Sequence, residues 1–188
     1  MKEKIIRSLT SILIFSTLLS PGRCLASDTQ ITEAVLKEKI KRFAKIGEGV
    51  YRSSQPSEEA YPLLKEFGIR TVVNFRHEED RISEEQSWTE SQGMRYVSIP
   101  WKIYDKTDPE IMKKFFSVIE EPANKPVLFH CRRGVERTGV ASVLYQMKFG
   151  GKSKKEAEET ELSPYPVNLI WKHSVKKRIN EFAEALNV

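Results

Sequence analysis

The sequence predicts an α/β domain with a small, mostly parallel sheet and helices on both of its faces. Short apolar runs bounded by turn residues alternate with segments that carry helix-start and helix-stop residues. Such alternation is typical of a parallel sheet covered by helices. The run 70–75 is apolar and partly β-branched, as expected for a buried strand. A chain of 188 residues suits one domain with a short appendage.

The composition excludes several classes of protein. Hydrophobic residues make up 39% of the chain and charged residues 30%, which is ordinary for a folded domain and unlike disordered, collagen-like or coiled-coil chains. The 2 cysteines cannot build a disulfide-stapled miniprotein or a four-cysteine zinc site. A net charge of +5 suggests a nucleic-acid or membrane partner only if that charge belongs to the folded domain.

The first residues have the layout of a secretory signal peptide. A basic start is followed by residues 8–19, which are uncharged and rich in Leu and Ile, and small side chains precede Ser27. We expect residues 1–26 to be removed by cleavage after Ala26, so that the protein is exported to the periplasm or secreted. An apolar core of about 12 residues is shorter than the ~20 needed to span a bilayer, so we expect no stable membrane anchor after cleavage. A retained anchor is the alternative.

Removing this segment changes the balance of charge and cysteine. Residues 1–26 carry a net +3, which leaves +2 for the remainder and argues against a nucleic-acid partner. Cys24 leaves with the signal, so Cys131 becomes a lone thiol in an exported protein. An unpaired cysteine in that setting needs a functional explanation.

Residues 27–45 are expected to form an N-terminal arm that leads into the domain, residues 46–188. The arm has a weak amphipathic face made by Ile31, Val35, Ile40 and Phe43. It is also rich in basic residues, which we expect on a solvated face: Lys37, Lys39, Lys41 and Arg42. A basic patch that binds a partner is the alternative, although acidic residues are interleaved.

The first half of the domain alternates between strands and helices. A short strand ends in residues 51–56, and Ser57 with the acidic pair after it opens a helix that Gly68 closes. The buried strand 70–75 follows, then a helix over 82–92 closed by Gly93 and a strand over 95–100.

The second half continues the alternation. Asp108 and Pro109 start a helix as a capping residue and a proline at the first helical position. A strand over 126–130 leads through a loop to a helix that begins near Thr138 and reaches Gly150. A capping box from Ser153 to Glu156 opens the next helix, and the last one covers 168–186.

Residues 130–139 carry the chemistry of the chain. Cys131 ends an apolar strand, at the edge of the sheet where open α/β folds bind ligands. A tight loop of Arg132, Arg133, Gly134, Val135 and Glu136 then separates it from Arg137. The backbone N–H groups of such a loop, reinforced by the helix that follows, can surround an anion. Gly134 permits the left-handed turn, and the guanidinium of Arg137 can clamp two phosphate oxygens.

The same surroundings favour an ionised thiol. Helix N-termini and neighbouring arginines stabilise thiolates, so we expect Cys131 to act as a nucleophile. Thr138 can donate a hydrogen bond to its sulfur. His130 orders the loop backbone through its ring nitrogens or serves as a satisfied core histidine. The alternative for Cys131, a buried small hydrophobe, does not account for the complete motif.

The segment 130–139 resembles the signature of cysteine-dependent protein tyrosine phosphatases, in particular the compact dual-specificity branch. Residues 50–56 and 71–76 are similar to the opening of exported bacterial members and of plant and fungal atypical members. The resemblance covers roughly residues 46–186. It implies the protein tyrosine phosphatase-like fold and a phosphocysteine mechanism without metal or organic cofactor. Cys131 would then be the nucleophile and Arg137 the phosphate clamp.

The family also uses an aspartate as general acid, on a loop after the preceding strand. Here that loop contains Asp105 and Asp108. Asp108 precedes Pro109 at a helix start and is better explained as a cap, so we assign the acid to Asp105. The tryptophan-proline-aspartate triplet of the larger tyrosine-specific enzymes is absent from the sequence.

The expected activity is hydrolysis of phosphotyrosine, and of phosphoserine or phosphothreonine, in a protein or peptide by a monomeric enzyme. Three alternatives stay open. Arg132 and Arg133 at the pocket mouth could suit inositol phosphates or inositol pyrophosphates, although Val135 and Glu136 argue against them. A non-catalytic phosphate-binding module and a rhodanese-like sulfur transferase are the others.

Overall fold

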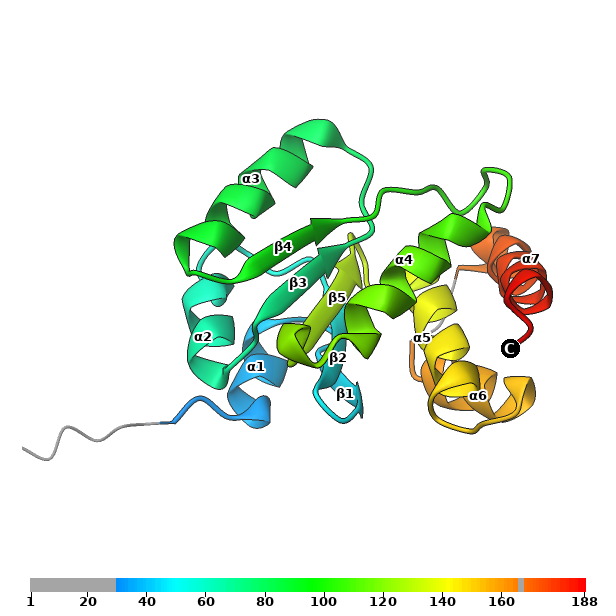
Figure 1. The fold of residues 1–188 in the computed structure, drawn as a ribbon, viewed down its shortest axis with the longest axis horizontal. Helices are drawn as coiled ribbons and strands as arrows, with labels where there is room; N and C mark the ends of the chain where they lie inside the picture. Colours follow the sequence, from blue (N-terminus) through cyan, green and yellow to red (C-terminus); the bar gives the residue numbers. More distant parts are fainter. Residues whose placement is uncertain (1–29, 166–167) are drawn as a thin grey trace, which may run out of the picture.

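The computed structural model describes residues 30–165 and 168–188 (Figure 1). The expected signal peptide, its cleavage site after Ala26 and the first residues of the arm lie outside the described residues. Within the described ranges, no helix is long and apolar enough to cross a membrane.

A mostly parallel sheet forms the centre of the fold, as predicted. Its strands lie in the order β1-β2-β5-β3-β4, with β1 antiparallel to β2 and every other pair parallel. The strands cover Ala44–Gly47 (β1), Val50–Ser54 (β2), Thr71–Asn74 (β3), Arg95–Ser98 (β4) and Val127–Cys131 (β5). The carboxyl ends of β2, β5 and β3 therefore meet at one edge of the sheet.

Helices cover both faces of this sheet (Figure 1). On one side lie α1 (Glu33–Lys39), α2 (Ala60–Phe67) and α3 (Glu79–Ser91). On the other lie α4 (Pro109–Glu120), α5 (Glu136–Lys148) and α7 (Leu169–Leu186), with α6 (Lys154–Glu161) packed on α5. A short 3-10 helix, η1 (Pro122–Asn124), leads into β5.

Strand β5 shows why the sheet needs two covering layers. All of its residues are buried, and their side chains alternate between the two faces. Val127 and Phe129 belong to the core under α4, α5 and α7, whereas Leu128 belongs to the core under α1 and α2. A continuous apolar run of this kind is stable only when both faces are covered.

Capping residues place several helix ends where the sequence predicts them. The Asp108 carboxylate accepts a hydrogen bond from the N–H of Glu110 at 3.0 Å, so Asp108 is the cap of α4. Ser153 and Glu156 form the predicted capping box of α6, and Asn168 caps α7. Gly68 closes α2 in a left-handed conformation with φ of 104°.

Three predicted helix starts are wrong by a few residues. Helix α2 begins at Ala60 rather than at Ser57, because the chain first makes a turn in which the N–H of Ala60 bonds to the carbonyl of Ser57. Helix α3 begins at Glu79 rather than Ile82, and α5 begins at Glu136 rather than Thr138.

The N-terminal arm is packed on the domain and contributes two elements. Leu36 and Ile40 are fully buried between α1 and the sheet, and β1 begins at Ala44. The sequence does not predict β1, because an edge strand of four residues with mixed exposure has no clear apolar period.

Candidate active site

Cys131 is the last residue of β5, at the carboxyl edge of the sheet. It pairs with Ser54 at the end of β2, and His130 pairs with Asn74 at the end of β3. The cysteine is free and its side chain is only 1% exposed. The predicted nucleophile thus lies beneath the loop that follows it.

The loop after Cys131 turns tightly because Gly134 has a φ of +67°. A Cβ atom at this position would lie 2.5 Å from the carbonyl oxygen of Ser53 and 2.6 Å from the backbone nitrogen of Ser54. Both neighbouring atoms are backbone and cannot move aside. Only glycine therefore fits here, as the sequence predicts.

Donors outside the loop hold its carbonyl groups. The carbonyl of Gly134 accepts from the Arg52 guanidinium at 2.8 Å, and the carbonyl of Arg133 accepts from Arg42 at 3.1 Å. The carbonyl of Arg132 accepts from the N–H of Gln55 at 3.3 Å. Since α5 begins directly afterwards, the N–H groups of its first turn have no helical acceptor and are available to an anion.

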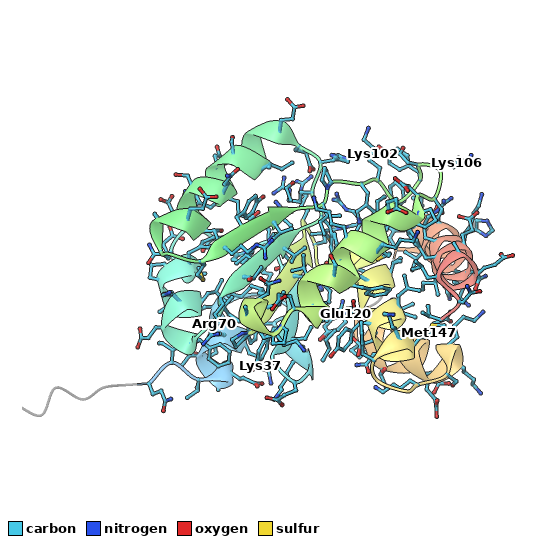
Figure 2. The ribbon with its side chains drawn as sticks, in the orientation of Figure 1. Lys37, Arg70, Lys102, Lys106, Glu120 and Met147 are labelled. Atoms are coloured by element: carbon cyan, nitrogen blue, oxygen red, sulfur yellow. The ribbon has the colours of Figure 1, made fainter. Side chains whose placement is uncertain are left out.

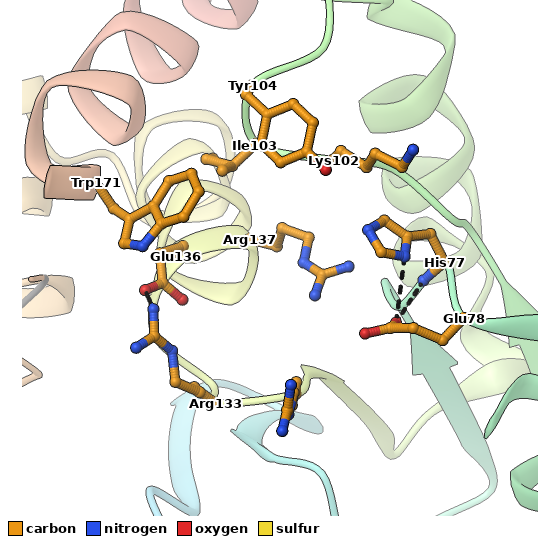
Figure 3. A pocket seen from close by; sticks show the side chains of 10 residues that line it. His77, Glu78, Lys102, Ile103, Tyr104, Arg133, Glu136, Arg137 and Trp171 are labelled. Carbon is orange, nitrogen blue, oxygen red and sulfur yellow. Dashed lines mark hydrogen bonds and ion pairs between the residues drawn. The ribbon is translucent and has the colours of Figure 1, made fainter.

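Arg137, in the first turn of α5, occupies the centre of the pocket (Figure 3). Its Nη1 donates to the carbonyl of Phe75 at 2.8 Å and to that of Trp101 at 3.2 Å. These bonds fix the guanidinium while its remaining N–H groups stay free for two oxygens of a phosphate. The arrangement agrees with the predicted clamp.

A pocket of about 610 Å³ surrounds Arg137. Figure 3 shows Tyr104 and Ile103 above the guanidinium, Trp171 to its upper left and Arg133 to its lower left. The rings of Tyr104 and Trp171 lie 6.1 Å apart with an interplanar angle of 30°. The complete lining is His77, Glu78, Lys102, Ile103, Tyr104, Arg132, Arg133, Glu136, Arg137 and Trp171. The opening therefore has an aromatic wall, Tyr104 with Trp171, and a basic wall, Arg132 with Arg133.

Asp105, the predicted general acid, is not in this lining. Its side chain is exposed, and its backbone N–H bonds to the carbonyl of Lys102 in a turn of the loop between β4 and α4. The residue before it, Tyr104, does line the pocket. Asp105 therefore lies next to the site without reaching it.

Glu78, which does line the pocket, is a poor proton donor. Partial burial opposes ionisation of Glu78, but hydrogen bonds from its own N–H and from Arg76 outweigh it and lower its pKa to about 2. Glu136 forms an ion pair with Arg133. Near neutral pH Glu78 is therefore a fixed negative charge at the rim, and Glu136 partly offsets the charge of Arg133.

Thr138 is buried at the start of α5, and the structure does not show the predicted bond to the cysteine sulfur. Its Oγ1 has no hydrogen-bond partner among the described residues. A buried hydroxyl without a partner is uncommon and costs stability unless a ligand or a charged group uses it. Val135 is also buried and is not part of the pocket lining.

His130 belongs to a buried polar network that the sequence does not predict. Its Nε2 lies 2.6 Å from Glu85 Oε1, and its Nδ1 lies 3.4 Å from the carbonyl oxygen of Cys131. Tyr61 and Asn74 also donate to Glu85, at 2.7 and 2.6 Å. Burial raises the pKa of a carboxyl group, but His130 and the hydrogen bond from Tyr61 lower the pKa of Glu85 overall. His130 is therefore a buried residue of the core, and one of its ring nitrogens lies near the carbonyl at the end of β5.

Arg52 is another residue with a candidate role at the site, and the sequence does not predict it. It is 0% exposed, and its Nη1 contacts Glu161 at 3.1 Å while its guanidinium stacks on Tyr165 at 4.4 Å. Together with its bond to Gly134, these contacts link β2 and α6 to the loop. A charged residue inside a short apolar strand is the signal that could have identified it.

Metal ligands are not grouped at this site. Within the described part of the chain, no three His, Cys, Asp or Glu side chains are placed to hold a metal ion. His77 and Glu78, which line the pocket, lead directly into helix α3 at Glu79.

Comparison with known proteins places most of the chain in one family. A family model described as DSP-PTPase phosphatase fused to NAD+ kinase matches residues 31–175. The chain is 30% identical over 110 residues to the dual specificity protein phosphatase TpbA of Pseudomonas aeruginosa, covering 58% of this chain and 48% of TpbA. It is 26% identical over 122 residues to inositol diphosphatase DSP3 of Arabidopsis thaliana, covering 62% of this chain and 59% of DSP3. The chain thus spans about half the length of the curated relatives it matches.

The fold is also similar to solved structures. A crystal structure of P. aeruginosa TpbA, in a cysteine-to-serine variant complexed with phosphotyrosine, superposes with a TM-score of 0.62 at 21% identity. The superposition covers 78% of this chain and 90% of TpbA in that crystal. This likeness supports the predicted α/β architecture.

Proposed function

Because the chain belongs to the family described as DSP-PTPase phosphatase fused to NAD+ kinase, we propose that it hydrolyses phosphotyrosine monoesters through a phosphocysteine intermediate. The observation that carries this proposal is the strand-loop-helix unit at Cys131. The loop is closed by Gly134 against β2, its carbonyls are bonded elsewhere, and the Arg137 guanidinium is fixed in the pocket above it. That geometry fits a phosphate dianion with a thiolate below it.

The reaction proceeds in two displacements. The Cys131 thiolate attacks phosphorus, an S–P bond forms, and the bond from phosphorus to the ester oxygen breaks. Arg137 and the loop N–H groups hold the non-bridging oxygens throughout. Water then attacks the phosphocysteine, its oxygen binds phosphorus, and the S–P bond breaks to release phosphate and restore the thiolate.

Each displacement needs a proton transfer, which we assign to Asp105. Its carboxyl group protonates the leaving oxygen, and the resulting carboxylate accepts a proton from the attacking water. Glu78 cannot serve, because a carboxyl group with a pKa of about 2 is ionised at neutral pH. This assignment requires the exposed loop at Asp105 to fold over the pocket when substrate binds, and its neighbour Tyr104 already lines the pocket.

The aromatic wall supports phosphotyrosine as the substrate group. Tyr104 is 60% exposed at the pocket mouth, beside the ring of Trp171, so both can contact the phenyl ring of a bound phosphotyrosine. The basic wall supports a second candidate, an inositol phosphate or pyrophosphate, and four relatives are named inositol diphosphatases.

Rates on phosphotyrosine peptides, phosphoserine peptides and inositol phosphates test the proposal. We expect the highest kcat/KM on phosphotyrosine peptides, no turnover by Cys131→Ser, and a decrease in kcat of roughly 10²–10⁴-fold for Asp105→Asn. Asp108→Asn is the matched control, because an amide oxygen preserves the cap of α4. Normal hydrolysis by Cys131→Ser would refute the mechanism. A large preference for an inositol phosphate would show that phosphotyrosine is not the preferred substrate.

A further inference from the structure

A second hollow adjoins the active pocket and shares its basic wall. This hollow, of about 430 Å³, has Arg132 and Arg133 in its lining, as the active pocket does. Its other walls come from the arm and from the end of β2. The complete lining is Lys39, Ile40, Lys41, Arg42, Ser54, Gln55, Ser57, Arg132 and Arg133. We call it the basic groove.

The charge of the basic groove is almost entirely positive. Five of its nine lining residues are Lys or Arg, and none is Asp or Glu. Among the described residues, Lys39, Lys41, Arg42 and Arg132 form no ion pair, and only Arg133 has an acidic partner, Glu136. Four of the five positive charges thus have no ion-pair partner in the described structure, so the groove attracts anions.

The groove is held against the loop of residues 132–136, which we call the catalytic loop under the proposed function. The backbone carbonyl of Lys41 accepts hydrogen bonds from both the N–H and the Oγ of Ser54, each at 2.9 Å. Arg42 has a φ of +60°, a conformation that costs a non-glycine residue free energy, and its guanidinium donates to the carbonyl of Arg133. The arm therefore presents its lysines at a fixed place beside the site.

We propose that the basic groove binds acidic side chains that flank the phosphotyrosine of a protein substrate. The inference rests on the proposed function and defines its substrate more narrowly. A phosphotyrosine in the pocket places neighbouring residues over Arg132 and Arg133, and an extended chain advances about 3.3–3.6 Å per residue. A few residues therefore reach Lys39 and Lys41. Glutamate or aspartate at these positions gains charge-assisted contacts that neutral residues lack.

Matched phosphotyrosine peptides test the groove. One peptide has glutamates before the phosphotyrosine and another has glutamates after it. Each has a control with glutamine at the same positions. We expect the wild-type protein to favour one acidic peptide by kcat/KM and to lose that preference as salt rises. In Lys39→Gln/Lys41→Gln, the ratio of acidic to neutral peptide should fall about fivefold, since each exposed charge contributes modestly.

A double variant at the other end of the sheet is the matched control. Lys65 and Arg70 are exposed and form no ion pair in the described structure, and Arg70 directly precedes β3. Figure 2 shows Arg70 far from Lys102, which lines the active pocket. Lys65→Gln/Arg70→Gln removes the same net charge and should leave the peptide ratio unchanged. Equal losses in both variants would show a general charge effect and overturn the proposal.

Binding to the Cys131→Ser protein separates failure of the groove from failure of the activity. If the wild-type protein hydrolyses none of the peptides, the proposed function fails, while fluorescence anisotropy still compares their Kd values. A lower Kd for an acidic peptide that depends on Lys39 and Lys41 supports the groove. Equal Kd values for acidic and neutral peptides overturn the proposal. Tight binding of inositol hexakisphosphate would not rescue it, because the proposal concerns acidic peptides.

Discussion

Gly134 lies where the catalytic loop passes closest to strand β2. Its positive φ favours glycine, and the nearby backbone of Ser53 and Ser54 excludes a side chain. The two constraints are separable because Gly151 has a nearly equal φ of +64°, but a Cβ there would have no neighbouring atom within 4 Å. A side chain at position 134 would thus push the loop away from β2, whereas a side chain at position 151 would only strain its own backbone.

We predict that Gly134→Ala lowers kcat/KM for an aryl phosphate by at least about 100-fold, because a loop displaced by roughly an ångström no longer surrounds the phosphate. Gly151→Ala should cost about 1 kcal/mol of stability and leave kcat/KM unchanged. Steady-state rates and thermal unfolding of both variants measure these effects. Equal activity in the two variants would contradict the role assigned to the loop.

Glu85 is a buried carboxylate whose ionised form the fold stabilises. Its pKa in the folded protein is below the usual 4.5, although burial acts in the opposite direction. A carboxyl group with a lowered folded pKa stabilises the protein above its unfolded pKa, and this contribution is lost as the pH falls through the folded value. Glu85 therefore contributes most at neutral pH.

We predict that Glu85→Gln lowers the free energy of unfolding by about 3 kcal/mol at pH 7, because it removes the charge beside His130. The difference from the wild type should shrink as the pH falls below 4.5, the usual pKa of the group. Urea unfolding across the pH range measures it. Glu84→Gln, on the exposed side of α3, is the control and should change stability little.

At the scale of elements, Arg52 connects strand β2 and helix α6 to the catalytic loop. It contacts both the carboxylate and the backbone carbonyl of Glu161, and it donates to the carbonyl of Gly134. Burial lowers the pKa of Arg52, and the charge of Glu161 opposes that shift. The pair thus keeps a charged side chain inside the protein and orients a loop carbonyl away from the phosphate site.

We predict that Arg52→Leu destabilises the protein by about 3–5 kcal/mol, because Glu161 is then a buried charge without its partner. The double variant Arg52→Leu/Glu161→Leu should recover part of this loss yet keep a lowered kcat, since Gly134 still lacks its donor. Denaturant unfolding and aryl phosphate kinetics separate the two effects. Full recovery of kcat in the double variant would show that the contacts of Arg52 affect only stability.

At the scale of the whole molecule, the positive charge is local rather than general. Apart from its first 26 residues the chain carries a net +2, yet five basic side chains line the basic groove. The arm that supplies three of them packs on the domain through Leu36 and Ile40. Net charge therefore gives little indication of the partner, whereas the placement of the charges does.

We predict that the chain is exported and cleaved after Ala26. Amino-terminal sequencing of the protein from the periplasm or the culture medium should then begin at Ser27. Deleting residues 2–26 should leave the protein in the cytoplasm with an unchanged kcat, because the described fold begins after this segment. Recovery of the protein only with its original Met1 would contradict this prediction.

Much of the fold follows from local signals. The caps at Asp108, Ser153 and Asn168 lie where short-range hydrogen bonding requires them, so the sequence places those helix starts correctly. The predicted start of α2 is wrong because Ser57 begins a turn instead, and a turn and a first helical turn share the same residue preferences. Strand β1 has no distinctive period and becomes a strand only by pairing with β2.

The sequence by itself determined the fold class and the family, and it predicts Cys131 and Arg137 as the reacting pair because their spacing in one loop is local information. Only the tertiary structure showed that Glu85 contacts His130, that Arg52 holds Gly134, and that Lys39 and Lys41 lie beside the active pocket. These residues are far apart in the chain. They come together because crossover connections place strands that are distant in the sequence side by side, and no local pattern records that order.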